Sequence, residues 1–317
     1  MIIAENMKIA VVSMTRNDDF RLNHWKQYFE DYRDELYKHI VVDNGSSFEY
    51  INDLKKHFPD STIIELGYNG GCTGAYNAGI KYALSDPKVE AIALIGNDVK
   101  IEKGGLTKLY KLLFSHPDYG MVGPVILKKD SDIIESFGCS LNLRTGLSTI
   151  LNSGRNISEL RGKTMEVGYV AGGANISKRS FYETDGVGLQ DENLFMYGDE
   201  RNMALRAVRK GYKEIVTSDV LAWHQHINKQ YLSGKNEDAR NPMVGFLIAR
   251  NFTYTQKEFF NRRITYIAVA YLLLNAVAVF LRHITNKTRR QYFYNYLKGI
   301  KAGLRGNMDN TFIRQSL

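Results

Sequence analysis

Cysteine is scarce in this chain. Cys72 and Cys139 are the only two, and neither belongs to a Cys-x-x-Cys pair or to a Cys/His metal spacing. This excludes a disulfide-rich scaffold and a zinc ribbon, and it suits a reducing compartment. Residues 1–10 lack a basic stretch followed by a long apolar one, so no secretory signal is predicted and we expect a cytoplasmic protein.

Acidic residues are nearly missing from the last part of the chain. Between Arg250 and Leu317 there are twelve lysines and arginines but only two acids, Glu258 and Asp309. The net charge of the whole chain is +8, so the preceding residues are close to neutral. A catalytic body of that charge is not typical of a nucleic-acid-binding protein. We expect the basic segment, residues 250–317, to bind an anionic membrane surface on the inner face of the cell membrane.

Long apolar runs are also rare, and Ile264 to Leu281 is the exception. Its eighteen residues are barely enough to cross a bilayer. Tyr271 and Asn275 share one helical face, and arginines precede and follow the run. Three alternatives are therefore open: a helix lying in the membrane plane, a helix buried in the core or in a homodimer, and a true membrane span.

The first hundred residues alternate between strand-like and helix-like periods. Short apolar runs predict strands at 8–14, 39–43, 62–66 and 91–95, with helices at 18–37, 50–58 and 71–84 between them. This order predicts an α/β fold with a mostly parallel sheet covered by helices on both faces. Further on we expect a helix at 106–115, strands at 121–127, 133–143, 166–177 and 214–226, a hairpin near Gly146, a helix at 197–210 and a polar loop at 228–241.

Acidic residues follow two of the predicted strands directly. Asp43 begins the motif Asp-Asn-Gly-Ser, and Asp98 closes the stretch Leu-Ile-Gly-Asn-Asp-Val. Ligands bind beyond the carboxyl ends of strands in open α/β sheets. Asp43 could accept hydrogen bonds from a ribose or a base, and Asp98 could hold Mg²⁺ or Mn²⁺ together with substrate phosphates. A turn or a helix cap would explain either acid equally simply.

The glycine-rich segment from Gly67 to Gly79 joins a strand to a helix. Its spacing is Gly-x-x-Gly-Gly-x-x-Gly and not Gly-x-Gly-x-x-Gly, which disfavours a dehydrogenase. Asn69 and Asn77 add amide groups that suit a nucleotide, although tight helix–sheet packing would also explain the glycines.

Two further groups of polar residues follow later in the sequence. Asp199 and Glu200 open a predicted helix, where the helix dipole favours ionised carboxylates that can accept a proton. His224 and His226 lie on one face of a predicted strand, where they could contact a metal or a phosphate or could be structural.

The order of these motifs resembles the family 2 glycosyltransferases over roughly Lys8 to His226, and it is most similar to the rhamnosyltransferase-like branch. The resemblance implies a GT-A fold for residues 1–240 and a helical, membrane-associated extension for residues 241–317. It also implies inverting, metal-assisted transfer of a sugar, with rhamnose from dTDP-rhamnose as the first expectation, to a glycan or lipid-linked saccharide in cell-surface polysaccharide synthesis.

The resemblance also implies roles for individual residues. Asp98 and His224 would bind the metal, and one carboxylate of Asp199 and Glu200 would be the general base. The nucleotide-sugar would be contacted by Thr15, Arg16, Asp43, Asn69, Gly70, Asn77, Asn97, Asp98, Gly172, Gly173 and Arg206. Two departures stand out: Gly96 replaces the usual polar or acidic residue two positions before the metal acid, and the usual Glu-Asp order is reversed.

The sequence leaves several alternatives open. The donor could be a UDP-hexose instead of dTDP-rhamnose, and either Asp199 or Glu200 could be the base. A nucleotidylyltransferase would need a glycine-rich, basic loop after the first strand, where residues 13–18 offer only Arg16. A membrane-tethered protein that binds a nucleotide-sugar without turnover is the third hypothesis.

Overall fold

The computed structural model describes residues 7–226, 241–282 and 285–316. A twisted sheet forms its centre, in the strand order β10-β12-β6-β11-β4-β1-β2-β3, with β5 beside β12 and β7 beside β6. The strands are β1 (Ile9–Thr15), β2 (Lys38–Asp43), β3 (Thr62–Glu65), β4 (Ala91–Ile95), β5 (Val99–Ile101), β6 (Tyr119–Lys128), β7 (Ile134–Ser136), β8 (Cys139–Leu141), β9 (Ser148–Ile150), β10 (Thr164–Val167), β11 (Ala174–Lys178) and β12 (Lys213–His224).

The sheet is mixed but mostly parallel. Strands β3, β2, β1 and β4 pair in parallel, as do β6 and β12, whereas β11 runs antiparallel between β4 and β6. The reversal at β11 places its first residues beside the carboxyl end of β4, where Ala174 pairs with Ile95.

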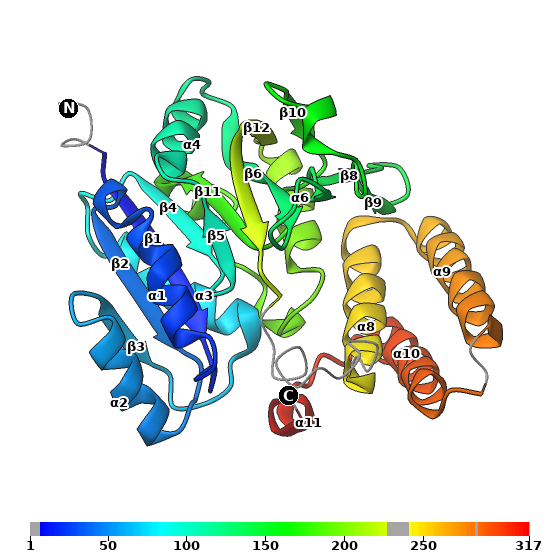
Figure 1. The fold of residues 1–317 in the computed structure, drawn as a ribbon. Coiled ribbons are helices and arrows are strands. Elements are labelled where there is room, and N and C mark those ends of the chain that lie inside the picture. The colour runs from blue at the N-terminus through cyan, green and yellow to red at the C-terminus, as the bar shows by residue number, and fades with distance from the viewer. Residues whose placement is uncertain (1–6, 227–240, 283–284, 317) are drawn as a thin grey trace.

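Helices cover both faces of this sheet (Figure 1). They are α1 (Leu22–Glu30), α2 (Phe48–His57), α3 (Gly71–Leu84), α4 (Gly105–Phe114), α5 (Arg179–Tyr182) and α6 (Asp199–Arg209), with short 3₁₀ turns at Arg33–Glu35, Ile157–Glu159 and Glu192–Leu194. Because side chains alternate along a strand, Val12 belongs to the buried apolar cluster that includes Ile80 of α3, while Val11 belongs to the cluster that includes Leu109 of α4. The predicted α/β layering is confirmed.

Two of the predicted strands are each interrupted. The expected strand at 133–143 is divided into β7 and β8, because Gly138 has a φ of 75°. The expected strand at 166–177 is divided into β10 and β11, which pair with different neighbours. The predicted hairpin near Gly146 is present as β8 and β9. The helix expected at 18–37 is shorter, because α1 ends at Glu30 and a 3₁₀ turn follows. Residues 228–240 of the expected polar loop lie outside the described residues.

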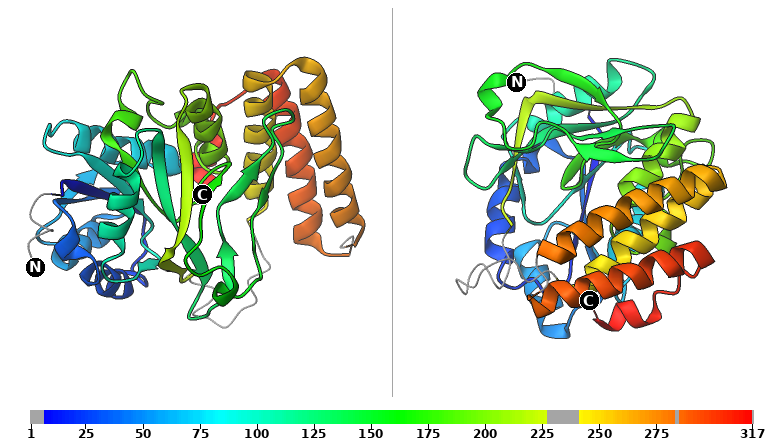
Figure 2. Two further views of the ribbon diagram at one scale, coloured as in Figure 1. Left: turned by 90° about the horizontal axis from the view of Figure 1, so that it is seen from above. Right: turned by 90° about the vertical axis from the view of Figure 1, so that its right-hand side faces the viewer.

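The remaining helices form a C-terminal extension beside the sheet (Figure 2). They are α8 (Pro242–Phe259), α9 (Arg262–Arg282), α10 (Lys287–Arg305) and α11 (Thr311–Ser316). Helices α8 and α10 touch backbone to backbone: a Cβ added to Gly299 would lie 2.3 Å from the carbonyl oxygen of Phe246. Among the described residues, no helix is both long and apolar enough to cross a membrane.

Candidate active site

Three strand ends bring the candidate site together. Thr15 ends β1, Asp43 ends β2, and Asp98 follows β4 by three residues. Thr15 and Asp43 are direct partners in the parallel ladder between β1 and β2. Since these strands run in the same direction, their carboxyl ends lie on one edge of the sheet.

The Asp43 carboxylate is fully buried and only half satisfied. Its Oδ2 accepts hydrogen bonds from the backbone N–H groups of Gly45 and Ser46, each at 3.2 Å. Its Oδ1 has no hydrogen-bond partner among the described residues. A buried, unpartnered carboxylate oxygen at a strand end is a ready acceptor for a ligand hydroxyl or N–H group.

Asn69 and Gly70 lie across from the Asp43 turn. Asn44 joins the two segments, because its Oδ1 accepts from the Gly70 N–H at 2.7 Å and its Nδ2 donates to Asn69 Oδ1 at 3.3 Å. A Cβ on Gly45 would lie 2.5 Å from the backbone of Tyr68, so only glycine permits this approach. The glycine-rich segment therefore lines the site at this point.

A polar network links the ends of β1 and β4. Asn97 donates through Nδ2 to Thr15 Oγ1 at 3.3 Å and to Asp18 Oδ2 at 2.9 Å. Its Oδ1 accepts from Arg21 Nη1 at 2.9 Å. Thr15 also bonds the hydroxyl of Tyr50. Asn97 thus fixes the geometry of the turn that carries Asp98.

Asp98 lies between two cationic groups. Its Oδ2 is 3.5 Å from Arg21 Nη1 and 3.5 Å from His224 Nε2. Burial tends to raise the pKa of Asp98, but the hydrogen bond from His224 and the charge of Arg21 outweigh it and lower the pKa. The carboxylate is therefore ionised at neutral pH.

Glu135, on β7, lies behind the two histidines. Its Oε1 is 3.0 Å from His224 Nδ1, and its Oε2 is 2.8 Å from His226 Nε2. Burial tends to lower the pKa of His224, but the hydrogen bonds to Asp98 and Glu135 outweigh it and raise the pKa to about 9. Ligand atoms of Glu135, His224 and His226 lie within 4.8 Å of one another, close enough to hold one cation.

The acid pair stands at the first turn of α6. Burial raises the pKa of Asp199, and burial together with the negative charge of Asp199 raises the pKa of Glu200 to about 8. Burial is the main cause that raises the pKa of Tyr76 on α3. The charges of Asp98, Asp199 and Glu200 raise this pKa further. Asp98 and the acid pair are therefore both close enough to Tyr76 for their charges to act on its hydroxyl.

The backbone of Gly172 and Gly173 lies between Asp98 and the acid pair. The carbonyl oxygen of Gly173 accepts from the Gly96 N–H at 2.8 Å. A Cβ on Gly172 would lie 2.2 Å from Glu200 Oε1, so this carboxylate rests directly on the glycine backbone. Arg16 also follows β1 at this edge of the sheet.

Two residues that we predicted to bind the nucleotide-sugar make other contacts. Asn77 Oδ1 accepts from the Gln190 N–H at 2.9 Å, and its Nδ2 donates to the Gln190 carbonyl at 2.9 Å. Arg206 Nη1 donates to the carbonyls of Val187 and Leu189, at 2.9 and 2.8 Å. Both side chains hold the backbone that leads into α6, and a direct nucleotide contact for either one stays a prediction.

Comparison with protein families decides the class. Residues 25–183, about half of the chain, match the model of Glycosyl transferase family 2. The chain belongs to this family. The mostly parallel sheet agrees with the GT-A fold that the sequence motifs implied. The roles of the individual site residues stay predictions.

Curated relatives are distant. The chain is 29% identical over 175 residues to the low-salt glycan biosynthesis hexosyltransferase Agl10 of Haloferax volcanii, a match that spans 54% of this chain and 53% of that protein. It is 22% identical over 303 residues to the dTDP-rhamnosyl transferase RfbF of Shigella flexneri, covering 95% of this chain and 97% of the relative. The match therefore spans only about half of Agl10 but nearly all of RfbF.

Solved structures share the fold. GalNAc-T7, crystallised with UDP, GalNAc and Mn²⁺, superposes with a TM-score of 0.58 at 13% identity over 80% of this chain and 48% of that one. TarS 1–349 of S. aureus superposes with a TM-score of 0.50 at 14% identity over 95% of this chain and 92% of that one. Likenesses at such low identity establish the fold alone.

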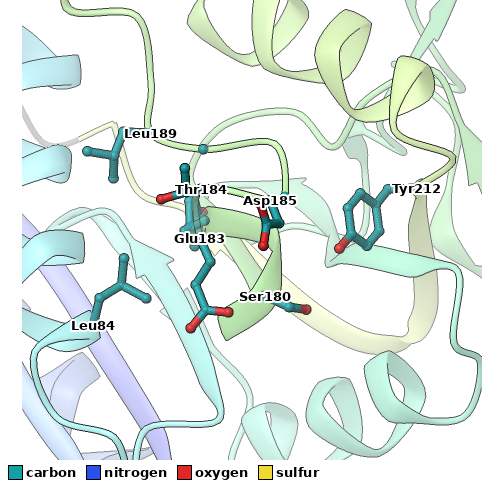
Figure 3. A pocket seen from close by; sticks show the side chains of 10 residues that line it. Leu84, Ser180, Glu183, Thr184, Asp185, Leu189 and Tyr212 are labelled. Carbon is teal, nitrogen blue, oxygen red and sulfur yellow. The ribbon is translucent and has the colours of Figure 1, made fainter.

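A pocket of about 730 Å³ lies elsewhere on the glycosyltransferase (Figure 3). It is lined by Leu84 at the end of α3, by Glu183 and Asp185 after α5, and by Tyr212 before β12. These positions belong to the amino-terminal edge of the parallel strands, opposite Asp98. None of the predicted site residues is among its described lining, so this pocket is not the candidate active site.

Several site residues were not predicted from the sequence. They are Arg21, directly before α1, Tyr76 on α3 and Glu135 on β7. Arg21 and Glu135 contact Asp98 and His224, respectively, and the pKa of Tyr76 is raised by the charges of Asp98 and the acid pair. The only sequence signal for Glu135 is that a lone acid interrupts the apolar stretch Ile133 to Phe137. Such a signal does not say which distant partner the acid meets.

Proposed function

We propose that the chain transfers a sugar from a nucleotide-sugar to an acceptor hydroxyl with inversion at the anomeric carbon, assisted by a divalent cation. The observation that carries the proposal is that the backbone of Gly96, Gly172 and Gly173 brings Asp98, with His224 beside it, near Glu200 of the acid pair. Asp98 and His224 suit a leaving diphosphate, and the acid pair suits a reacting hydroxyl.

The donor set at Asp98 fits a divalent cation. Asp98 Oδ2 and His224 Nε2 are 3.5 Å apart, a separation that two ligands of one ion can adopt. Because the pKa of His224 is about 9, its Nε2 would have to release a proton when the cation binds. His224 Nδ1 faces Glu135, and metal-binding histidines commonly donate their second ring N–H to a carboxylate in this way. A mixed carboxylate and imidazole set suits Mn²⁺ better than Mg²⁺, which prefers oxygen alone. When bound, the cation would neutralise the diphosphate of the donor.

Asp199 is the better candidate for the base. A general base must be ionised before the acceptor arrives, and the negative charge of Asp199 is one of the causes that raise the pKa of Glu200. Glu200 is therefore mostly protonated at neutral pH, because its pKa is about 8, which leaves Asp199 as the base that we propose. In this proposal Asp199 takes the proton from the acceptor hydroxyl, and the neighbouring Glu200 lies against Gly172.

The donor we propose is dTDP-rhamnose. The proposal is supported by similarity to RfbF along nearly the full length of both chains, and a UDP-hexose is the alternative that the hexosyltransferase Agl10 suggests. Asp43, Asn69 and Gly70 would contact the nucleoside, with Thr15, Arg16 and Asn97 beside it. Asp43 Oδ1, buried without a partner, supports this assignment.

The acceptor we propose is a saccharide or lipid-linked saccharide at an anionic membrane surface. One face of α9 supports this proposal, because its apolar side chains Ile267, Leu274 and Leu281 are exposed. Cationic residues stand at both ends of that face, namely the exposed Arg262 and Arg263 before it and Lys287 and Arg290 after it. An exposed apolar stripe between cations is typical of a helix that lies in a membrane interface. A homodimer through the same face is the alternative.

A donor panel tests the proposed function. Purified protein is incubated with dTDP-, UDP- and GDP-sugars and Mn²⁺ or Mg²⁺, while thermal shift and release of nucleoside diphosphate are measured. We expect a shift and release with dTDP-rhamnose, and loss of release in Asp98→Asn. If no nucleotide-sugar shifts the melting temperature, the proposed function is wrong. Binding without release that Asp98→Asn does not weaken would indicate a binding protein instead.

A further inference from the structure

The segment from Val187 to Gly198, which leads into the acid pair, has an unusual backbone. Phe195 and Tyr197 have φ values of 66° and 67°, and Gly198 has a φ of 85°. Left-handed conformations are unfavourable for aromatic residues, and they persist only where the surrounding structure enforces them. This segment, which we call the acid-pair loop, is therefore held in place by its neighbours.

The neighbours hold the acid-pair loop by its carbonyl oxygens. Apart from the turn at Glu192–Leu194, the loop has no regular structure, and buried side chains satisfy its backbone. The donors come from α3, α6, α8 and the residue before α11, namely Thr73 and Asn77, Arg206, Arg250 and Asn251, and Asn310. The C-terminal extension supplies three of these six residues.

Asn251 makes the densest set of contacts. Its Nδ2 lies 2.7 Å from the carbonyl oxygen of Leu194 and 2.8 Å from those of Met196 and Tyr197. The side chain is 1% exposed, and its Oδ1 accepts from Arg250 Nε at 3.0 Å. Three carbonyls of one short segment can converge on a single nitrogen only if the chain reverses between them, which the left-handed residues Phe195 and Tyr197 achieve.

The residues that Asn251 contacts come just before Asp199 and Glu200 in the sequence. Tyr197 is two positions before Asp199, and Gly198 between them is the N-cap of α6. A Cβ on Gly198 would lie 3.7 Å from Asn251 Cβ, so the helix start itself rests on this side chain. On its other side the loop is bounded by α3, where the Thr73 N–H donates to the Phe195 carbonyl at 3.1 Å.

We infer that Asn251 is a positioning residue for sugar transfer, and that the C-terminal extension thereby sets the geometry of the acid pair. The inference rests on the proposed function insofar as Asp199 or Glu200 accepts the proton. Without the Asn251 amide, three carbonyl oxygens of the acid-pair loop lose a hydrogen-bond donor, and the loop relaxes towards ordinary backbone angles. The first turn of α6 then shifts, and a displacement of about 1 Å at a reacting group can lower a rate about 10²-fold.

The extension contains a matched control residue. Gln256 is also on α8 and also fully buried, and its Nε2 donates to the carbonyl of Thr145 at 3.0 Å. It therefore makes the same type of contact with the catalytic body, but away from the acid-pair loop. Asn251→Ala and Gln256→Ala remove equivalent groups from one helix.

The experiment combines kinetics with hydrogen–deuterium exchange in the full chain. We expect Asn251→Ala to lower kcat about 10²-fold with little change in the KM for the donor, and to speed exchange over residues 193–200. Gln256→Ala is expected to leave kcat and this exchange near the wild-type values. Asn251→Leu retains most of the side-chain volume and removes the donors without burying a charge, so it serves if the alanine variant does not fold.

The two variants and the two measurements decide whether Asn251 has a positioning role. If Asn251→Ala leaves both kcat and exchange over 193–200 unchanged, or if Gln256→Ala reproduces its losses, Asn251 has no positioning role. The exchange measurement needs no substrate, so it reports on the loop even if no donor is turned over. Absence of turnover in the wild type would overturn the proposed function, whereas unchanged exchange would overturn this inference.

Discussion

At the scale of single residues, two adjacent acids differ in their surroundings and in what raises their pKa values. Asp199 and Glu200 are neighbours in the sequence, yet Glu200 rests on Gly172 and has a pKa of about 8. When one carboxylate of a buried pair is ionised, its negative charge raises the pKa of the other. Glu200 is therefore mostly protonated near neutral pH, and Asp199 is the carboxylate that we propose as the base.

This difference predicts unequal effects of two isosteric substitutions. We expect Asp199→Asn to lower sugar transfer by about 10²–10⁴-fold, because a positioned base contributes that much. Glu200→Gln is expected to cost less, since Glu200 is already protonated. Initial rates at saturating donor measure both, with donor binding by thermal shift as the control. A larger loss in Glu200→Gln would assign the base to Glu200.

Glu135 allows a second test at this scale. It bonds both His224 and His226 without contacting Asp98 in any described interaction. Outer partners of this kind typically contribute about 10–100-fold to metal affinity. We expect Glu135→Gln to weaken Mn²⁺ binding by that factor in an electron paramagnetic resonance titration without nucleotide. Glu166→Gln, at an exposed position on β10, is the control, and equal affinities in the two variants would contradict the prediction.

At the scale of elements, α9 presents a surface that its neighbours leave open. It packs on α8 and α10 through residues such as Ala268 and Val269, while Leu274 on the opposite face is 70% exposed. Exposed apolar side chains in a row indicate an interaction site. The surface is attached to the same extension that holds the acid-pair loop.

A charge placed on this surface tests membrane binding. We expect Leu274→Glu to reduce sedimentation with phosphatidylglycerol vesicles, because it places an acid among apolar side chains facing anionic lipid. Phe48→Glu, at a position on α2 that is 73% exposed, is the matched control and should sediment like the wild type. Equal sedimentation of both variants, with a dimer that only Leu274→Glu dissociates, would favour the homodimer.

At the scale of the whole molecule, buried acids make folding depend on pH. Glu214 on β12 is 4% exposed, and its Oε2 accepts from the Val170 N–H at 2.8 Å. Its Oε1 has no partner among the described residues, and burial raises its pKa to about 8. The folded protein therefore binds a proton more tightly here than the unfolded chain does.

The sign of the pH dependence follows from that shift. Between about pH 4.5, the ordinary pKa of a glutamate, and about pH 8, the folded state holds the proton and the unfolded state does not, so stability falls as pH rises. One such group contributes a slope of up to about 1.4 kcal/mol per pH unit. We expect Glu214→Gln to be stabilised relative to the wild type at pH 8 and much less so at pH 5, as measured by urea denaturation. An equal shift at both pH values would show that Glu214 is ionised in the folded protein.

The sequence by itself determined most of the elements and the positions of Asp43 and Asp98 at the strand ends. Strand and helix periods depend on local alternation, which is why β4 and α3 have the predicted bounds and why Asp43 and Asp98 lie on one edge. Only the tertiary structure decided what surrounds them. Buried carbonyls and carboxylates must find partners wherever the fold provides them, and no local pattern records that Asn251 meets Tyr197 or that Glu135 meets His224.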